Sequence, residues 1–231
     1  MEAELRQEAA RLLFREWFVY FRFPGHEKIK IVDGLPEGWE RVHLEDLVET
    51  QYGYTETATD EELGPKFLRG TDINKNSYID WCAVPYCTEQ GLNFEKYALS
   101  KDDILVIRMA DPGKVAIIEK NIRAIFASYL VRLKIKPNAP LLPYFLFYKL
   151  SNEQYQGFIA NASTGSTRQS ASAKLLVNFH FVLPPLPLQE MFNNYIIPLR
   201  AQMNTCLDQN AALKKARDLL LSRLLNGTIQ V

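Results

Sequence analysis

Residues capable of catalysis are scattered along this chain of 231 residues. His26, His43 and His180 are far apart, and the sequence contains no HExxH, GxGxxG or nucleophile-elbow motif. The segment DPGK lacks the first glycine of a phosphate-binding loop and the hydroxyl residue that follows its lysine. We therefore expect neither catalytic residues nor a metal site in this chain.

A competing hypothesis is a stand-alone nuclease or methyltransferase that uses carboxylates such as Asp102, Asp103 and Asp111. It predicts metal-dependent DNA cleavage or methyl incorporation by the purified chain alone. The sequence has no Asn/Asp-Pro-Pro-aromatic loop of the kind that holds an extruded base during amino methylation. This absence favours a binding protein over an enzyme.

The residues best suited to contact a ligand are polar and lie in loops. Residues 163–170, STGSTRQS, combine hydroxyl groups, a glycine, a guanidinium and an amide. Small residues let backbone N–H groups approach a phosphate, and Arg and Gln have the donor geometry to read base edges. We therefore assign DNA contacts to Ser166, Thr167, Arg168 and Gln169. An ordinary polar connection between a helix and a strand is the alternative.

Two further turns carry basic or hydroxyl side chains. The segment FLRGTDI places Arg69 and Thr71 on either side of a glycine, and Arg108 and Lys114 flank an Asp-Pro-Gly turn. These four residues are predicted DNA contacts, and phosphate positioning is expected of most of them. Tyr52 and Tyr54, in the loop-like segment QYGYTET, are expected either to contact bases or to pack.

These loops must be held by a mixed scaffold. The apolar runs between them are short and rich in β-branched residues, which is typical of strands separated by turns. We therefore predict an α+β fold, with one mixed α/β domain flanked by two helices. The predicted strands are 103–108, 114–119, 128–135 and 178–183, and the predicted helices inside the domain are 44–48, 143–159 and 171–176.

The mixed domain lies between segments of different character. A helical pattern over 2–22 ends at Phe-Pro-Gly, and a polar linker follows it. The predicted segments are an N-terminal helix (1–23), a linker (24–35), the mixed domain (36–184) and a C-terminal spacer helix (185–231).

The C-terminal segment has the pattern of one long helix. Pro198 falls near its start and Gly227 just after its end, so a regular helix is expected from Leu188 or Leu199 to Leu225. At about 1.5 Å per residue, such a helix is longer than a domain of this size is expected to cover. The length therefore favours a helix that holds a partner.

Apolar residues recur along this helix at steps of three and four, which is typical of a coiled-coil seam. Two polar members, Asn210 and Arg217, are expected to fix its register. The facing helix is either that of a second copy or the N-terminal helix, through Phe14 and Trp17. An amphipathic helix that packs on its own domain is the alternative. The predicted seam is Leu199, Met203, Cys206, Asn210, Leu213, Arg217, Leu220 and Leu224.

Charge is balanced overall but unevenly distributed. The chain has 27 basic and 27 acidic residues, which argues against a strongly basic nucleic-acid binder. Residues 28–100 hold 7 Lys and Arg against 14 Asp and Glu, whereas residues 101–180 hold 11 against 5. A basic second half is compatible with one face of the domain that meets phosphates.

The sequence predicts a cytoplasmic protein with no membrane segment. The N-terminus, MEAELRQEAAR, is acidic and helical where a signal peptide would be basic and then apolar. No run of eighteen apolar residues occurs. The three cysteines lack paired spacing, so neither a disulfide framework nor a zinc site is predicted.

Ordered fragments connect these features to a known family. The segments LPEGWERVHLEDL, FLRGTDI, DILVIR with GKVAII, ASYLVRLKI, STGSTRQ, LPPLPLQ and LLLSRLLNGTI follow one another along the chain. In that order they resemble the DNA-specificity subunits of type I restriction-modification systems. The opening EAARLLFREWFVYFRFPGHE is similar to the end of the helix that precedes a second recognition domain in those subunits.

The resemblance implies that residues 36–184 form a target-recognition domain and that the C-terminal helix is a spacer. Such subunits have two recognition domains that each read half of a split DNA sequence, and their helices form an antiparallel coiled coil. The implied partners are double-stranded DNA and modification (methyltransferase) subunits, which restriction subunits can join. The modification subunits bind S-adenosylmethionine and methylate adenine, so this chain is expected to hold no cofactor and to be non-catalytic.

This chain departs from the family pattern in having one recognition domain. It is expected either to form a homodimer that reads two identical inverted half-sites or to be the C-terminal half of a longer subunit. Two alternatives remain open: a specificity subunit of a related type II restriction-modification enzyme, and a coiled-coil adaptor that contacts only protein.

Overall fold

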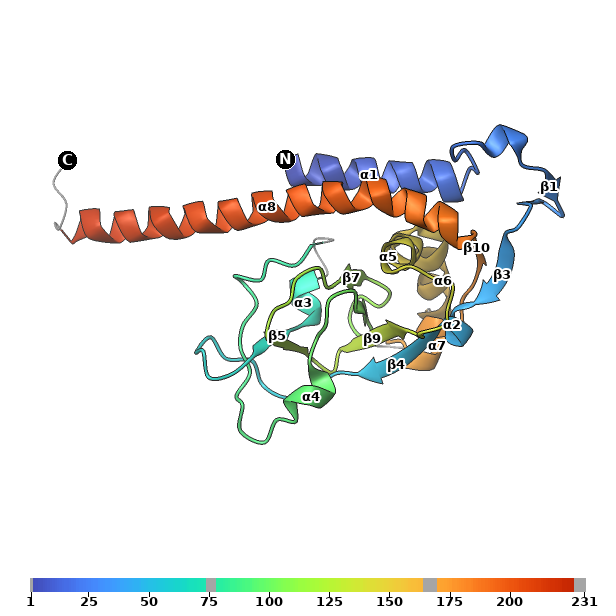
Figure 1. The fold of residues 1–231 in the computed structure, drawn as a ribbon. Helices are drawn as coiled ribbons and strands as arrows, with labels where there is room; N and C mark the ends of the chain where they lie inside the picture. The colour runs from blue at the N-terminus through green and yellow to red at the C-terminus, as the bar shows by residue number, and fades with distance from the viewer. Residues whose placement is uncertain (1, 74–77, 164–169, 227–231) are drawn as a thin grey trace.

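The long helix α8 (Leu186–Leu225) dominates the computed structural model, which describes residues 2–73, 78–163 and 170–226. A mixed α/β domain lies beneath the first part of this helix, and α1 (Glu2–Phe18) runs beside it (Figure 1). The far end of α8 projects beyond the domain. This arrangement confirms the predicted α+β class, in which one mixed domain is flanked by two helices.

The domain contains a four-stranded antiparallel sheet of order β4-β9-β6-β7 and a parallel pair, β5-β8. β10 and β3 form a separate antiparallel ribbon, in which Phe181 is opposite Val42. Every residue of β6 is buried, because this strand lies inside the sheet. The strands are β1 (Ile31–Val32), β2 (Leu35–Pro36), β3 (Glu40–His43), β4 (Val48–Tyr52), β5 (Lys66–Leu68), β6 (Ile104–Ile107), β7 (Val115–Ile117), β8 (Ala124–Phe126), β9 (Leu130–Ile135) and β10 (His180–Leu183).

The remaining helices are short and lie within the mixed domain or just before it. α5 packs against both the sheet and the two long helices, and six of its residues are buried. The helices are η1 (His26–Lys28), α2 (Leu44–Leu47), α3 (Gly70–Ile73), α4 (Phe94–Tyr97), α5 (Pro143–Ser151), α6 (Glu153–Ser163) and α7 (Ala173–Val177).

Helix α1 ends at Phe18, four residues before the predicted boundary. The backbone N–H groups of the next two residues both donate to the Arg15 carbonyl, at 3.0 and 2.9 Å. Phe21 then adopts a left-handed conformation with φ 59°, which the helix cannot accommodate. The apolar spacing continues past this point because Phe21 packs edge-on against Trp39, 5.2 Å between ring centroids, from outside the helix.

The single helix predicted over 143–159 is two helices, α5 and α6. Asn152 separates them with an extended backbone, φ −78° and ψ 154°. Its side-chain Oδ1 accepts a hydrogen bond of 3.1 Å from the Gln154 backbone N–H. Asparagine favours this role at a helix start, because its side chain satisfies an N–H group that has no partner inside the helix.

The apolar pattern does not predict β4, β5 or β8. β4 has the sequence VETQY, most of whose side chains are at least partly exposed. Its extended conformation depends on pairing with β9, in which Tyr52 is opposite Val131. The prediction that Tyr52 lies in a loop is therefore wrong, because this residue is the last of a strand.

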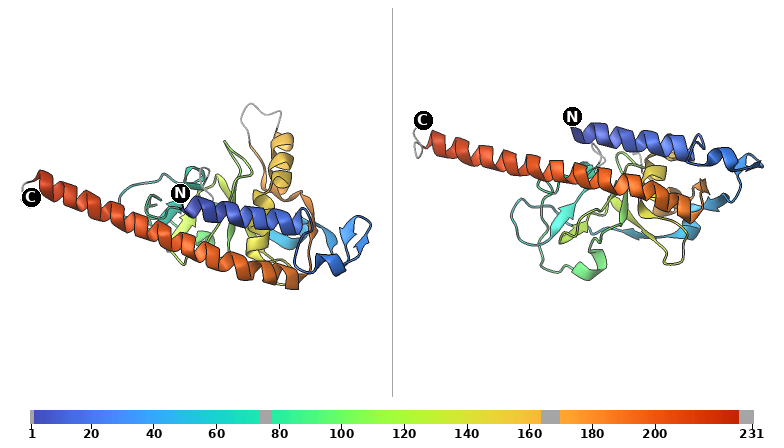
Figure 2. Two further views of the ribbon diagram at one scale, coloured as in Figure 1. Left: turned by 90° about the horizontal axis from the view of Figure 1, so that it is seen from above. Right: turned by 45° about the horizontal axis from the view of Figure 1, so that its top comes forward.

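Helices α1 and α8 run antiparallel, side by side (Figure 2). Near the N-terminus of α1, the Arg6 guanidinium donates to the Gln202 side chain at 2.7 Å. At the other end of α1, the Trp17 ring lies 5.7 Å from that of Tyr195. Since α1 begins four residues before Arg6, most of α8 beyond Gln202 extends past the end of α1.

Helix α8 begins at Leu186, two residues before the earlier of the two predicted starts, and continues through Pro198. The buried amide of Gln189 fixes its beginning to the domain. Its Nε2 donates to the carbonyls of Pro140 and Pro184, both at 2.9 Å, and its Oε1 accepts from the Leu142 N–H at 2.9 Å. The helix direction is thus set by hydrogen bonds as well as by apolar packing.

Candidate functional site

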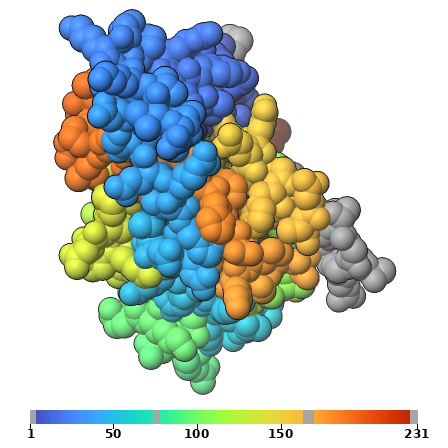
Figure 3. Space-filling model, turned by 90° about the vertical axis from the view of Figure 1, so that its right-hand side faces the viewer, coloured from blue at the N-terminus to red at the C-terminus, as the bar shows by residue number. Residues whose placement is uncertain are grey.

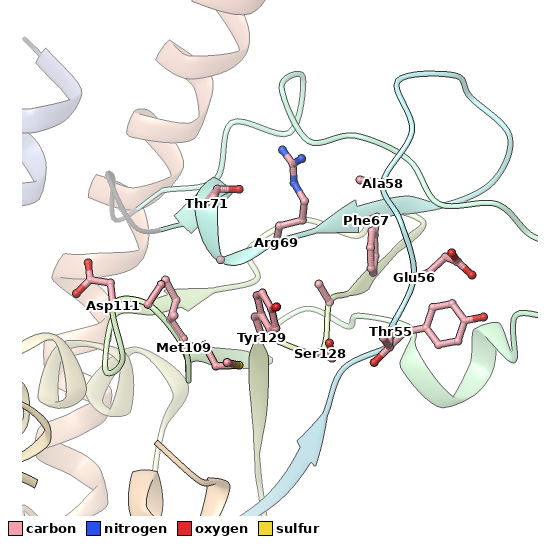
Figure 4. A pocket seen from close by; sticks show the side chains of 15 residues that line it. Thr55, Glu56, Ala58, Phe67, Arg69, Thr71, Met109, Asp111, Ser128 and Tyr129 are labelled. Atoms are coloured by element: carbon pink, nitrogen blue, oxygen red, sulfur yellow. The ribbon is translucent and has the colours of Figure 1, made fainter. Parts of the chain in front are cut away.

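A pocket of about 500 Å³ opens where β5, β6 and β8 end (Figure 4). We call it the central pocket. Its lining combines apolar side chains with an arginine, two carboxylates and several hydroxyl groups. The lining residues are Tyr54, Thr55, Glu56, Ala58, Phe67, Arg69, Gly70, Thr71, Ile107, Met109, Ala110, Asp111, Ala127, Ser128 and Tyr129.

Arg69 and Thr71, two predicted DNA contacts, lie in this lining at the start of α3. The Arg69 backbone N–H, Nε and Nη2 donate to the Asp72 carboxylate at 2.8, 3.1 and 2.9 Å. These hydrogen bonds raise the pKa of Arg69, so the guanidinium remains charged. Its side chain is 40% exposed, so a phosphate can approach it without disturbing the core.

Arg108 lies beside the central pocket, just after β6. Its guanidinium is 5.1 Å from the ring centroid of Tyr52, and Nη1 lies 3.6 Å from the Met109 sulfur. The buried Nε has no hydrogen-bond partner among the described residues. A charged guanidinium with so few acceptors is well suited to take a phosphate or base oxygen.

The four contacts predicted in the polar loop, Ser166, Thr167, Arg168 and Gln169, lie outside the described residues. The chain leaves α6 at Ser163 and is described again from Ser170. These assignments therefore stay predictions.

The end of this loop is attached beside the central pocket. Ser170 forms an isolated β-bridge with Met109, and the Ala171 N–H donates to the Arg108 carbonyl at 2.7 Å. Two residues later, the Ala173 N–H donates to the Tyr52 hydroxyl at 2.9 Å. The structure thus brings the base of the polar loop together with Arg108 and with a residue that lines the central pocket.

Lys114 does not line the central pocket. It is exposed just before β7, and its carbonyl accepts a hydrogen bond of 2.9 Å from the Ile107 N–H. The preceding Gly113 has φ 97°, and a Cβ there would lie 3.1 Å from Ile159. The turn is therefore tightly packed against α6, and of its residues Asp111 lines the central pocket.

Ser128 and Tyr129 are among the lining residues that were not predicted as contacts, whereas Tyr54 was expected either to contact bases or to pack. The Ser128 N–H donates to the Tyr54 carbonyl at 2.8 Å, and the Tyr129 side chain is 56% exposed. The sequence predicts a strand from residue 128, whereas β9 begins at Leu130. A two-residue break between two apolar runs was the only signal for this turn.

The predicted residues Phe14 and Trp17 of α1 face α8 of their own chain. Their rings lie 5.8 and 6.0 Å from the Phe192 ring, and both residues are buried. Along the first half of α8, Leu199 is only half-buried. The buried line of this half is Gln189, Phe192, Ile196, Arg200 and Met203.

The charged residue in this line, Arg200, forms a buried ion pair with Glu119. Its Nε and Nη2 donate to the two carboxylate oxygens at 2.8 and 2.6 Å, and the two side chains are 3% and 9% exposed. The Tyr144 hydroxyl also donates to Glu119, at 3.1 Å. Burial, with the adjacent Glu119 charge, raises the pKa of Tyr144. The bidentate geometry fixes the orientation of α8 against the domain.

The second half of α8 is exposed. Leu213, Leu220 and Leu224 of the predicted seam are 68%, 53% and 40% exposed, and Cys206 at its beginning is half-buried. This run of leucines has no partner helix in the described part of the chain.

The two polar members of the predicted seam, Asn210 and Arg217, do not lie against another helix. Both line a shallow groove of about 440 Å³ that α8 forms with Tyr78 and Asp80 of the mixed domain. Arg217 also forms an exposed ion pair with Asp218, at 2.7 Å. The face of α8 that carries these two residues is therefore turned partly toward its own domain. Their role in fixing the register of a coiled coil stays a prediction.

A family model described as the type I restriction modification DNA specificity domain matches residues 36–199. The match covers the mixed domain and the first part of α8, and so defines the chain as a DNA specificity protein. The chain belongs to the DNA specificity family of type I restriction-modification systems.

Two curated relatives are specificity subunits of type I restriction enzymes. The chain is similar to that of EcoBI from Escherichia coli, with 26% identity over 82% of this chain and 41% of the relative. It is also similar to that of MjaIX from Methanocaldococcus jannaschii, with 23% identity over 99% of this chain and 54% of the relative. The chain therefore spans about half the length of these relatives.

Two solved structures share the fold. The S subunit of a type I restriction-modification system from M. genitalium superposes with a TM-score of 0.66 at 16% identity, over 96% of this chain and 55% of that one. The HsdS subunit from Thermoanaerobacter tengcongensis gives 0.54 at 19% identity, over 98% and 52%. Both superpositions cover the mixed domain together with α1 and α8.

Of the helices in the described ranges, none has the length and apolar composition of a membrane span. The same ranges contain no group of three His, Cys, Asp or Glu side chains placed to bind a metal ion.

Proposed function

We propose that this chain is the DNA-recognition component of a type I restriction-modification complex. It reads one half-site of a bipartite target in double-stranded DNA and holds the modification subunits that methylate adenine. The observation that carries this proposal is the attachment of one recognition domain to a long helix that is buried in its first half and exposed in its second.

The DNA contacts proposed here gather around the central pocket. Arg69 and Thr71 line it, and Arg108 lies beside the base of the polar loop. We assign phosphate positioning to Arg69 and Arg108, since each holds a guanidinium at a partly exposed site. We assign base reading to Arg168 and Gln169, whose donors match base edges.

The proposed role of α8 is to set the distance between two half-sites. Its 40 residues span about 60 Å at about 1.5 Å per residue. This is longer than the ~34 to 36 Å of one duplex turn, so two domains on paired helices can reach successive turns. In a homodimer the exposed halves of α8 pair, and two identical half-sites are read in inverted orientation.

The chemistry is proposed to belong to partner subunits. In this account the modification subunits bind S-adenosylmethionine and transfer its methyl group, and restriction subunits join through the complex. The chain itself is non-catalytic and supplies DNA contacts and helices. Purified alone, it should neither cleave nor methylate DNA.

Selection from a randomised DNA library, with the modification subunits present, tests this proposal. A single bipartite sequence should be enriched. Arg69→Ala should weaken binding uniformly across sequences, whereas Arg168→Ala should relax one base position at a loss of about 1 to 3 kcal/mol. Arg22→Ala, an exposed arginine near the end of α1, is the matched control and should bind normally. Enrichment of no sequence would contradict the proposal.

A further inference from the structure

A second pocket, of about 340 Å³, shares no lining residue with the central pocket. We call it the lysine pocket. It opens where the end of α1, β3, β10 and the start of α6 meet, on the side of the molecule that Figure 3 shows. Its lining residues are Phe18, Val19, Phe21, Arg41, Lys149, Gln154, Phe179, His180, Phe181 and Val182.

Lys149 is almost completely buried at this pocket, with 4% of its surface exposed. Its ammonium group donates to the Gln154 side chain at 2.8 Å and lies 5.8 Å from the Phe181 ring centroid. An ammonium has three N–H donors, and in the described chain one of them has an acceptor. The charge therefore lacks a carboxylate partner, which buried lysines usually have.

The surroundings of Lys149 are basic and aromatic. Burial lowers the pKa of Lys149 to about 8, because the charged form is poorly solvated. Arg41 and His180 also line the pocket, and among the described lining residues there is no Asp or Glu. The pocket thus presents three basic side chains over a floor of phenylalanine rings, a complement for a negatively charged group.

The backbone of β10 adds a second feature of this site. Consecutive strand residues point to opposite faces, yet Phe179, His180, Phe181 and Val182 all line the pocket. The pocket therefore follows an edge of the strand. β10 belongs to a two-stranded ribbon, so in the described part of the chain its edge away from β3 pairs with no strand. An unpaired edge is a template for an added strand.

We propose that the lysine pocket binds an extended peptide segment that carries a carboxylate and is supplied by a partner protein. The segment adds a strand to the free edge of β10, and its carboxylate accepts hydrogen bonds from the Lys149 ammonium. We choose the modification subunit as that partner, and this choice rests on the proposed function. The binding of a carboxylate peptide in the pocket does not rest on it.

A blocked peptide, acetyl-Thr-Val-Asp-Val-Thr-amide, tests the pocket directly. Titrated into the wild-type chain and followed by NMR, it should shift the backbone amide signals of His180–Leu183. Its affinity should exceed that of the same peptide with Asn in place of Asp by about tenfold, as expected for a charge-assisted hydrogen bond. Lys149→Met should abolish this difference, whereas Lys174→Met, an exposed lysine on α7, should preserve it. Equal affinities of the two peptides for wild type, or no shift in β10, would overturn the proposal.

Binding of the purified modification subunit tests the choice of partner. Lys149→Met should weaken it about tenfold or more while leaving DNA half-site binding and thermal stability at least as high as in wild type. A purely structural lysine would instead lower thermal stability when replaced. Unchanged binding in Lys149→Met overturns the assignment of this partner. Failure of the wild-type chain to bind the modification subunit would refute the proposed function, and the peptide titration would still decide the pocket.

Discussion

The two halves of helix α8 have opposite environments. From Leu186 to Met203 the helix is packed between α1 and the mixed domain, and it buries an amide and a guanidinium along with its apolar residues. Beyond Leu207 the helix is mostly exposed, with six leucines whose exposure ranges from 40% to 86%. One continuous helix thus has a part that is fixed to the domain and a part whose leucines are exposed.

The difference shows how one helix performs two tasks. The buried half needs specific polar contacts, since Gln189 and Arg200 each satisfy a partner from a distant part of the chain. The exposed half needs only a repeated apolar face if, as proposed, its partner is a second helix. Paired variants, one in each half, test this division.

The largest effect is expected from truncating the aromatic centre of the buried half. Phe192 is fully buried among the rings of Phe14, Trp17 and Tyr148. Phe192→Ala should lower the free energy of unfolding by about 4 kcal/mol, because it removes apolar contacts and leaves a cavity. Below the concentration at which two chains pair, Leu220→Ala in the exposed half should cost less than about 0.5 kcal/mol. Urea denaturation of both variants measures the contrast, and equal losses would contradict it.

A smaller effect is expected from breaking ion pairs in the two halves. Arg200→Met leaves the Glu119 carboxylate buried without its cation, at a cost of about 3 kcal/mol. Arg217→Met removes an exposed pair with Asp218, whose side chain is 62% exposed, and should change the free energy of unfolding by less than about 0.5 kcal/mol. Thermal unfolding of both variants at one pH distinguishes the pairs. A similar loss in both would mean that α8 is not fixed by Glu119.

A still smaller effect concerns pH and Lys149, a buried residue of α5, the helix that packs against the buried half of α8. Its pKa of about 8 lies below the ordinary 10.5, so between these values the unfolded chain binds more protons. The free energy of unfolding should therefore rise by about 1.5 kcal/mol from pH 8 to 9.5 relative to Lys149→Met. Lys215→Met, in the exposed half, should keep this rise. The same rise in Lys149→Met would show that another group causes it.

The heptad pattern predicts that α8 exists and where it ends, but not which side of its first half is buried. Phe192 and Met203 are on the buried line, whereas Leu199 is half-buried and Arg200 is buried instead. Two bodies, α1 and the domain, pack on this half from different directions, so no single apolar stripe describes it. Burial of Arg200 depends on Glu119, which is 81 residues away in the sequence.

The strands that the sequence predicts have mostly apolar side chains. β6, β7, β9 and β10 are apolar and are predicted, because they are central or packed on the helices. β4 is largely polar, and its conformation comes from pairing with β9, which local sequence cannot indicate. Tyr52 consequently lies on a strand, and its hydroxyl accepts from the Ala173 N–H near the base of the polar loop.

At the central pocket, the sequence identifies residues by chemical type and the fold decides which of them meet. Arg69 and Thr71 line the pocket, but Lys114 does not, although it comes from the same turn as Asp111. Tyr129 was absorbed into a predicted strand because its neighbours are apolar. Only the structure shows that Tyr129 lies outside the strand, because β9 begins one residue later, at Leu130.

The central claim is that the exposed half of α8 pairs with a second copy of the chain. Sedimentation equilibrium of the wild-type chain and of a Leu220→Asp/Leu224→Asp variant tests it most directly. We predict a mass of twice 26.6 kDa for the wild type and of 26.6 kDa for the variant, with the same helical content per chain. A wild-type chain that remains at 26.6 kDa at all concentrations, or a variant that still doubles its mass, would contradict the account.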